Sequence, residues 1–121
     1  MVMPNDVLIV EDDALIAIDF EAMVLELGVG SVRTAAGVAQ ALAMISERAP
    51  DFALLDVGLG LENSFSVAEL LQSLKIPFIF VTGYRTDVTL ASRFADRPVL
   101  HKPCLMEELE AVLRGDSTMA D

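Results

Sequence analysis

Short apolar runs that end in a charged or hydroxyl-bearing residue are the feature that most constrains this chain. Glu11 and Asp12 follow one such run, Asp56 ends a second, Thr82 follows a third and Lys102 lies just beyond a fourth. Each run has the length of a β-strand or less, so a polar side chain stands where each strand is expected to end. Carboxylates, a hydroxyl and an ammonium group in this arrangement are typical of a metal-assisted phosphoryl-transfer site.

Five of the apolar runs are predicted to be strands, because near-continuous apolarity is typical of parallel strands that are buried on both faces. These strands cover residues 7–10, 31–34, 52–55, 78–81 and 99–100. Helical periodicity predicts helices at residues 14–27, 38–48, 66–74 and 86–94, and a fifth helix after Pro103. The first helix is expected to bury one stripe of side chains, formed by Ile16, Phe20, Met23, Val24 and Leu27.

Five successive strand–helix units predict a three-layer α/β sandwich. The expected fold is a doubly wound (βα)5 arrangement of flavodoxin-like type, with a parallel five-stranded sheet in the order 2-1-3-4-5. The length predicts a single domain, residues 1–121, with a core at about 5–114 and a tail at 115–121. In such sheets ligands bind beyond the carboxyl ends of the strands, so the topology itself predicts that the polar landmarks converge.

Composition narrows the classes of function. The formal net charge of −11 argues against nucleic-acid binding and against an anionic membrane surface, because both ligands are themselves negative. No apolar run approaches the ~18 residues that span a bilayer, and no secretory signal is visible. The single cysteine, Cys104, excludes an internal disulfide and fits a cytoplasmic protein. A cation, or a partner with a basic rim, is the favoured ligand.

Three converging carboxylates, from Glu11, Asp12 and Asp56, would repel one another unless a cation lay between them. Each pair at ~4 Å costs roughly 1 kcal/mol in water and ~4 kcal/mol at an effective dielectric constant of 20. Oxygen ligands that leave room for water suit Mg²⁺, which we therefore predict as the cofactor. Asp56 is either a third metal ligand or a nucleophile toward phosphorus. The plainer alternatives are a solvated strand end for Asp56 and helix capping for Asp12 and Asp13, with capping the favoured role of Asp13.

The other landmarks are suited to holding an anionic group. The hydroxyl of Thr82 and the backbone amide of Gly83 could bind a phosphoryl oxygen, and Lys102 would supply a mobile positive charge. The only histidine, His101, is assigned no chemistry. With one histidine and one cysteine, the chain has no ligand set typical of zinc.

Four segments of the chain together resemble the receiver domain of response regulators of the CheY type. They are VLIVEDD (residues 7–13), ALLD (53–56), VTG (81–83) and HKP (101–103). Each segment is weakly specific alone, whereas the ordered set spans essentially the whole chain and is highly specific.

This resemblance implies that Asp56 accepts a phosphoryl group from a histidine kinase or a phosphotransfer protein, and that Thr82 and Lys102 hold it. It implies a stand-alone switch, relay or phosphate sink that is a monomer or a phosphorylation-dependent dimer. Such a protein is not expected to be an enzyme, because it assists only its own phosphoryl transfer and dephosphorylation. The implied ligands of Mg²⁺ are Asp12, Asp56, the backbone carbonyl of Gly58 and, through water, Glu11.

The chain departs from the usual receiver pattern around its last strand. Receivers usually carry an aromatic switch residue three positions before the lysine, and this chain has Val99 there. The usual coupling of Thr82 to an aromatic ring is therefore in question. The segment FIFVTGY (residues 78–84) is similar to single-domain receivers associated with HWE-type sensor kinases, in which Tyr84 would be the nearby aromatic. The resemblance also implies a cis peptide bond before Pro103. The predicted switch is an ordering of residues 83–94.

A second apolar strip on the first helix is expected to contact a partner. It consists of Leu15, Ile18, Ala22 and Leu25, and the resemblance implies that the kinase docks there. Packing against the fifth helix is the alternative.

Two other classes of function compete with the receiver. A magnesium-dependent phosphatase of haloacid-dehalogenase type also uses a strand-end aspartate, but it needs an acid two residues later, where this chain has Gly58. A phosphate-independent interaction domain is the third class, and the intact set of polar landmarks argues against it.

Overall fold

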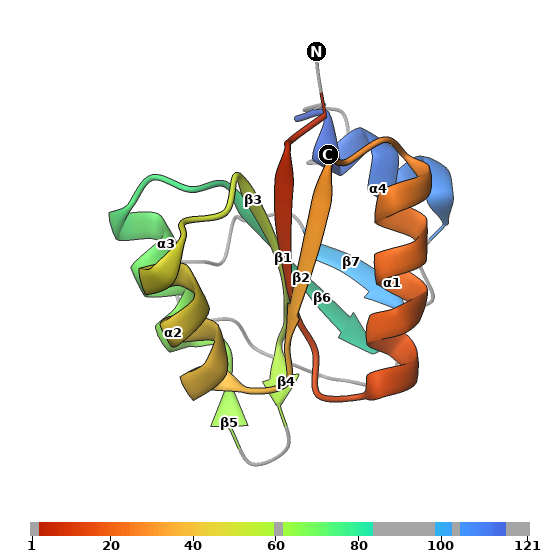
Figure 1. The fold of residues 1–121 in the computed structure, drawn as a ribbon. Coiled ribbons are helices and arrows are strands. Elements are labelled where there is room, and N and C mark those ends of the chain that lie inside the picture. Colours follow the sequence, from red (N-terminus) through yellow and green to blue (C-terminus); the bar gives the residue numbers. More distant parts are fainter. Residues whose placement is uncertain (1–2, 60–61, 84–98, 103–104, 116–121) are drawn as a thin grey trace.

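The structure, a computed structural model, describes residues 3–59, 62–83, 99–102 and 105–115. Its centre is a five-stranded sheet in which every neighbouring pair is parallel (Figure 1). The strands are β1 (Asp6–Val10), β2 (Ser31–Ala35), β3 (Phe52–Asp56), β6 (Phe78–Gly83) and β7 (Val99–Lys102). Their order, β2-β1-β3-β6-β7, confirms the predicted doubly wound sheet.

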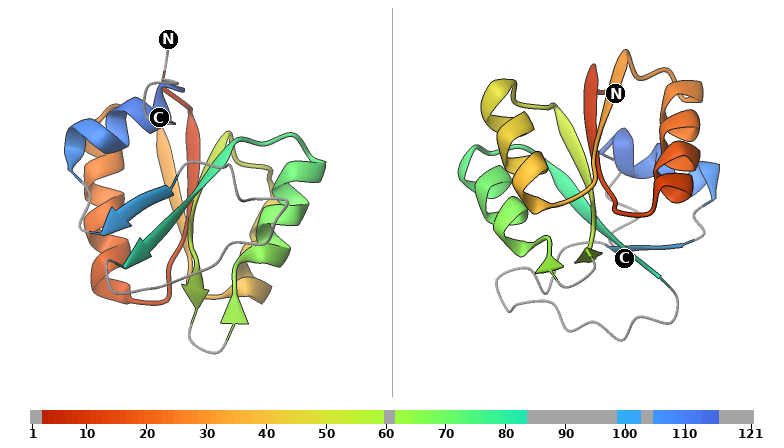
Figure 2. Two further views of the ribbon diagram at one scale, coloured as in Figure 1. Left: turned by 180° about the vertical axis from the view of Figure 1, so that it is seen from behind. Right: turned by 60° about the horizontal axis from the view of Figure 1, so that its bottom comes forward.

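Helices cover both faces of this sheet, which makes the fold a three-layer sandwich. They are α1 (Ala14–Glu26), α2 (Val38–Glu47), α3 (Phe65–Ser73) and α4 (Met106–Leu113). Helices α1 and α4 lie on one face and α2 and α3 on the other, as the views in Figures 1 and 2 agree. The first three helices begin and end within one residue of the predicted positions, and α4 is the helix predicted after Pro103. The helix predicted at residues 86–94 lies outside the described residues.

Alternate residues of the central strands belong to two separate hydrophobic cores, because successive side chains of a strand point to opposite faces. In β1, Leu8 and Val10 pack with α2 and α3, whereas Val7 and Ile9 pack with α1 and α4. Strands β3 and β6 are divided in the same way. All five residues of β1 and all five of β3 are buried, which explains why these runs are apolar almost without interruption.

Helix α1 has well-defined ends. The carboxylate of Asp13 accepts the backbone N–H groups of Leu15 at 3.0 Å and Ile16 at 3.3 Å, which confirms its predicted role as N-cap. Gly28 follows the last turn with a φ of 102°, a left-handed conformation that favours glycine. Asp12 lies between the end of β1 and this cap.

The buried face of α1 is centred one position away from the predicted stripe. Ala17, Phe20 and Val24 are buried. Three members of the predicted stripe are only partly buried and pack against the same core: Ile16, Met23 and Leu27. The helix is apolar on several sides, so the sequence period alone does not distinguish these neighbouring orientations.

A short antiparallel hairpin between β3 and α3 was not predicted. It consists of β4 (Gly58–Leu59) and β5 (Glu62–Asn63). Its sequence, rich in glycine and without apolar alternation, is typical of a turn. The hairpin starts two residues after Asp56 and therefore lies at the carboxyl edge of the sheet.

An ion-pair cluster ties the opposite edge of the sheet together. Asp6 opens β1 and is buried, and it accepts hydrogen bonds from Nη2 of Arg33 at 2.6 Å and from the hydroxyl of Ser31 at 2.8 Å. The same guanidinium donates to the carbonyl oxygens of Met44 at 3.1 Å and Arg48 at 2.8 Å. One side chain of β2 thereby joins β1 to the end of α2.

The pKa of Asp6 lies below its ordinary value of 3.8. Burial by itself would raise this pKa, but it is outweighed by hydrogen bonds from Arg33 and Ser31 and by the charges of Arg33 and Arg48. The ionised form of Asp6 is therefore the one that the folded state stabilises.

Candidate functional site

The polar landmarks of the sequence lie along the carboxyl edge of the sheet. Glu11 follows β1, Asp56 is the last residue of β3, and Lys102 is the last residue of β7. Strand β1 is flanked by β2 on one side and β3 on the other, so the chain order reverses beside it. This is the point at which doubly wound sheets bind their ligands.

Three carboxylates converge at this point. Oxygen atoms of Glu11, Asp12 and Asp56, one from each residue, all lie within 4.8 Å of one another. Glu11 and Asp56 are buried, with 4% and 8% exposure, whereas Asp12 is exposed. The structure therefore brings together the three side chains predicted to bind metal.

Local contacts fix the position of this cluster. The Glu11 carboxylate accepts the backbone N–H of Asp13 at 3.1 Å, and the backbone N–H of Glu11 donates to the carbonyl oxygen of Ala35 at 2.9 Å. On the other side, the backbone N–H of Val57 donates to the carbonyl oxygen of Val81 at 3.1 Å. The pairing of β3 with β6 thus continues one residue beyond the carboxylate.

The cluster has the character of a site for a hard divalent cation. All three side chains offer oxygen, two of them are withdrawn from water, and the third leaves the site open on its exposed side. Carboxylates this close repel one another, and a divalent cation removes that repulsion. The predicted backbone ligand, Gly58, opens β4 two residues after Asp56.

Thr82 lies on the strand next to Asp56. Val81 is the register partner of Asp56, and Thr82, the following residue, is 6% exposed. The next residue, Gly83, pairs with Lys102 of β7. The backbone therefore places Thr82, Gly83 and Lys102 on two neighbouring strand ends at the same edge.

Of the remaining switch and cis-proline positions, the structure describes Val99 only. Val99 is partly buried, pairs with Phe80 and packs with the core beneath α2 and α3, as an ordinary apolar residue would. Tyr84, Pro103 with its expected cis bond, and the switch segment after Gly83 lie outside the described residues.

The second apolar strip of α1 faces solvent. Leu15 is 76% exposed, Ile18 58% and Leu25 47%, and Ala22 between them is exposed as well. Within the described residues, α4 contacts α1 without burying these side chains, which favours an interaction surface over packing against α4. Large apolar side chains exposed together are typical of an interaction surface.

One feature beside the site has no signal in the sequence. A groove of about 270 Å³ is lined by Asp12, Glu21, Thr34 and Gln40, among others. Glu21, Thr34 and Gln40 come from α1, β2 and α2, and Asp12 comes from the segment that joins β1 to α1, so no single motif contains all four. The groove could be found only once the three elements were placed together.

None of the helices within the described ranges has the length and apolar character needed to cross a bilayer.

The chain matches the response regulator receiver domain family over residues 7–114. The phyllosphere-induced regulator PhyR of Methylorubrum extorquens is 32% identical over 114 residues, which are 92% of this chain and 43% of PhyR. The chain thus spans less than half the length of that relative.

Solved structures are similar to this one over nearly the whole chain. The solution structure of SdrG from Sphingomonas melonis Fr1 is 43% identical with a TM-score of 0.82, and the match covers 96% of this chain and 98% of SdrG. The BeF3-activated conformation of SdrG from Pseudomonas melonis Fr1 is also 43% identical, with a TM-score of 0.77 and coverage of 94% and 97%. With its doubly wound sheet and its acidic cluster at the strand ends, the chain belongs to the family of response regulator receiver domains.

Proposed function

We propose that this protein accepts a phosphoryl group on Asp56 from a phosphohistidine of a sensor kinase or a phosphotransfer protein, with Mg²⁺ as cofactor. The observation that carries the proposal is the convergence of the Glu11, Asp12 and Asp56 carboxylates within 4.8 Å at the edge where a doubly wound sheet binds ligands. Membership of the receiver family supports it. The modified protein would act as a signalling switch, a relay or a phosphate sink.

The proposed chemistry is a single displacement at phosphorus. A carboxylate oxygen of Asp56 forms the new bond to phosphorus while the phosphorus–nitrogen bond of the donor breaks. The donor imidazole leaves with the electron pair and takes up a proton. The product is an acyl phosphate on the last residue of β3.

The other residues of the edge would hold the reacting group in place. Asp12, Asp56 and the carbonyl oxygen of Gly58 would bind Mg²⁺, with Glu11 acting through water, and the ion would supply positive charge to the phosphoryl oxygens. The Thr82 hydroxyl, the backbone N–H of Gly83 and the Lys102 ammonium would hold the remaining oxygens. The positions of Thr82 and Gly83 at the end of β6, and of Lys102 at the end of β7, support these roles.

The relative SdrG supports the same interpretation. SdrG is 43% identical to this chain and is known in a BeF3-activated conformation. Beryllium trifluoride mimics a phosphoryl group on a carboxylate, so activation by it is what a phosphate-accepting receiver is expected to show.

The test is direct. The protein is incubated with Mg²⁺ and acetyl phosphate, its intact mass is measured, and the acyl phosphate is trapped by borohydride and located by peptide mapping. We expect the mass of one phosphoryl group, located at Asp56. No gain of mass, or a gain located elsewhere, would contradict the proposal, and sustained hydrolysis of a phosphomonoester would favour a phosphatase instead.

Magnesium is expected to stabilise the folded protein because it relieves the repulsion within the carboxylate cluster. At a hundredfold excess of Mg²⁺ over its dissociation constant, linkage predicts a gain of roughly 2.7 kcal/mol in the free energy of unfolding. The measurement is a series of thermal melts in MgCl₂, compared with NaCl at matched ionic strength. Asp12→Asn should lose most of the response, whereas Asp19→Asn, an exposed change elsewhere on α1, should keep it. A melting temperature that ignores magnesium would argue against the metal site.

The exposed strip of α1 is the proposed docking surface for the kinase. Leu15→Glu places a charge on this surface without touching the core, because Leu15 is 76% exposed. We expect phosphotransfer from the kinase to slow roughly tenfold, which corresponds to about 1.4 kcal/mol, while the rate with acetyl phosphate stays the same. The matched control is Leu74→Glu at the end of α3, also exposed, which should change neither rate. Equal slowing with both donors would indicate a folding defect and not a docking surface.

A further inference from the structure

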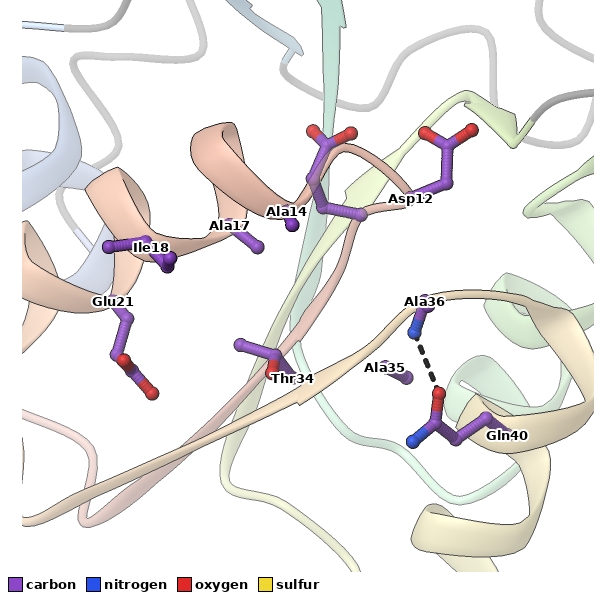
Figure 3. A pocket seen from close by; sticks show the side chains of 10 residues that line it. Asp12, Ala14, Ala17, Ile18, Glu21, Thr34, Ala35, Ala36 and Gln40 are labelled. Atoms are coloured by element: carbon purple, nitrogen blue, oxygen red, sulfur yellow. Dashed lines mark hydrogen bonds between the residues drawn. The ribbon is translucent and has the colours of Figure 1, made fainter.

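A groove beside the proposed phosphoryl site lies between α1, the edge strand β2 and the start of α2 (Figure 3). Four of its lining residues are alanines: Ala14, Ala17, Ala35 and Ala36. Such short side chains leave open the space between a helix and the last strand of the sheet, which gives the groove its volume of about 270 Å³. Its apolar floor could accommodate the methylene groups of a long side chain.

The rim of the groove is acidic. Glu11, Asp12 and Glu21 line it, and none of its lining residues is basic. Glu11 and Asp12 belong to the proposed metal site, but Glu21 does not. In Figure 3 the side chain of Glu21 extends from α1 toward β2, the strand that carries Thr34. Within the described ranges no lysine or arginine forms a salt bridge with Glu21.

The groove is continuous with the apolar strip of α1. Its α1 residues, Ala14, Ala17, Ile18 and Glu21, are spaced as one side of a helix. The strip that begins at Leu15 lies on the adjacent side, and Ile18, 58% exposed, belongs to both. A partner that lies along the strip therefore passes the mouth of the groove.

We propose that the groove receives an arginine or lysine side chain of the protein that donates the phosphoryl group. The aliphatic part of that side chain packs on the alanine floor and Ile18, and its charged end pairs with Glu21. The acidic rim and the net charge of −11 both favour a basic partner at this place. The inference rests on the proposed function, because it assigns to the phosphodonor a second point of contact on α1.

The test compares two charge-neutralising variants of α1. Glu21→Gln removes the charge at the groove and keeps the shape, whereas Glu26→Gln removes the same charge from an exposed position of α1 outside the groove. The probe is an isolated dimerisation and histidine-phosphotransfer domain from a kinase that is encoded in the same genome. Among such domains, the one that binds the wild-type protein most tightly is used. Calorimetry gives the dissociation constant of the unphosphorylated probe, and rapid quench gives the rate of transfer from the phosphorylated probe.

We expect Glu21→Gln to weaken binding and to slow transfer about fivefold at low ionic strength, with a smaller effect at high salt. Glu26→Gln should stay close to the wild type, and neither variant should change the rate with acetyl phosphate. Ala36→Met, which fills the groove from an exposed position and leaves every carboxylate in place, should weaken the same probe.

The outcomes separate the groove from the phosphorylation itself. If Glu21→Gln and Ala36→Met both bound the probe as tightly as the wild-type protein does, the inference would be overturned. Equal slowing with the probe and with acetyl phosphate would also overturn it, because the change would then act on the reacting site and not on docking. Failure of the wild-type protein to react with acetyl phosphate would contradict the proposed function, whereas the binding constants would still decide the role of the groove.

Discussion

The Asp56→Asn variant is expected to take up no phosphoryl group, either from acetyl phosphate or from a phosphorylated kinase, and to remain folded. The substitution is nearly isosteric, but a neutral amide is a poor nucleophile toward phosphorus. It also removes one of three negative charges that lie within 4.8 Å of one another. Each carboxylate pair at such a distance costs about 1 to 4 kcal/mol, depending on the effective dielectric constant, so the variant should be at least as stable as the wild type without magnesium.

Intact-mass measurement over a time course with acetyl phosphate and Mg²⁺ checks the chemistry, and thermal melts without metal check the stability. Asp19→Asn is the matched control, because it makes the same chemical change at an exposed position of α1. It should be phosphorylated at the wild-type rate. Phosphorylation of Asp56→Asn to one equivalent would show that the nucleophile is another residue.

Loss of the salt bridge between Arg33 and Asp6 should produce the other large effect, on stability. Arg33→Met keeps much of the aliphatic volume but leaves the Asp6 carboxylate, whose side chain is only 12% exposed, without its main partner. Breaking a buried pair from one side typically costs 3–5 kcal/mol, and we expect roughly 3 kcal/mol here because both side chains retain some contact with water. Arg33 also donates to the carbonyl oxygens of Met44 and Arg48, so the end of α2 should loosen with it.

Urea unfolding measures this loss as a lower midpoint at a similar slope. The control is Arg48→Met, because the Arg48 side chain is 61% exposed and its contact with Asp6 is long, at 3.5 Å. An exposed pair of this kind contributes at most about 1 kcal/mol. If both variants lost the same stability, the buried geometry around Arg33 would not be the cause.

The same pair predicts how stability depends on pH. The pKa of Asp6 is lowered in the folded state, so its ionised form adds stability above the ordinary pKa of 3.8 that it has in the unfolded chain. That contribution is lost as the pH falls through the still lower folded pKa. The difference in stability between wild type and Arg33→Met should therefore be large at neutral pH and shrink below about pH 4. A difference that stays constant into acid would contradict the role assigned to the charge of Asp6.

The strands could be predicted from sequence because their physical requirements are local. A strand buried on both faces must be apolar at nearly every position, as β1, β3 and β6 are. Strand β2 lies at the edge, and its burial is accordingly weaker, with an exposed Ser31 at its start. The convergence of Glu11, Asp12 and Asp56 could also be predicted from the sequence, because the carboxyl ends of parallel strands lie at the same edge of a sheet whatever the details of packing.

Features that depend on distant partners could not be predicted in this way. Asp6 and Arg33 are 27 residues apart, and nothing in either neighbourhood indicates that they pair. The groove near Glu21 depends on alanines of α1 and alanines at the end of β2, two elements that are separate in the sequence but adjacent in the fold. Ala17 is buried while Ile16 is only partly buried, because the rotation of α1 is determined by how the helix packs on the sheet and not by its apolar period alone.

The division of each central strand between two cores has a mechanical consequence. Neighbouring side chains such as Leu54 and Leu55 are held from opposite sides, so the strand cannot slide or twist without opening a void on one side and crowding the other. The sheet is thus a rigid support, and Asp56 lies at its carboxyl edge as the last residue of β3. A group added to Asp56 should therefore change the structure only along the carboxyl edge of the sheet. The opposite edge, where Asp6 and Arg33 form a salt bridge, should keep its structure.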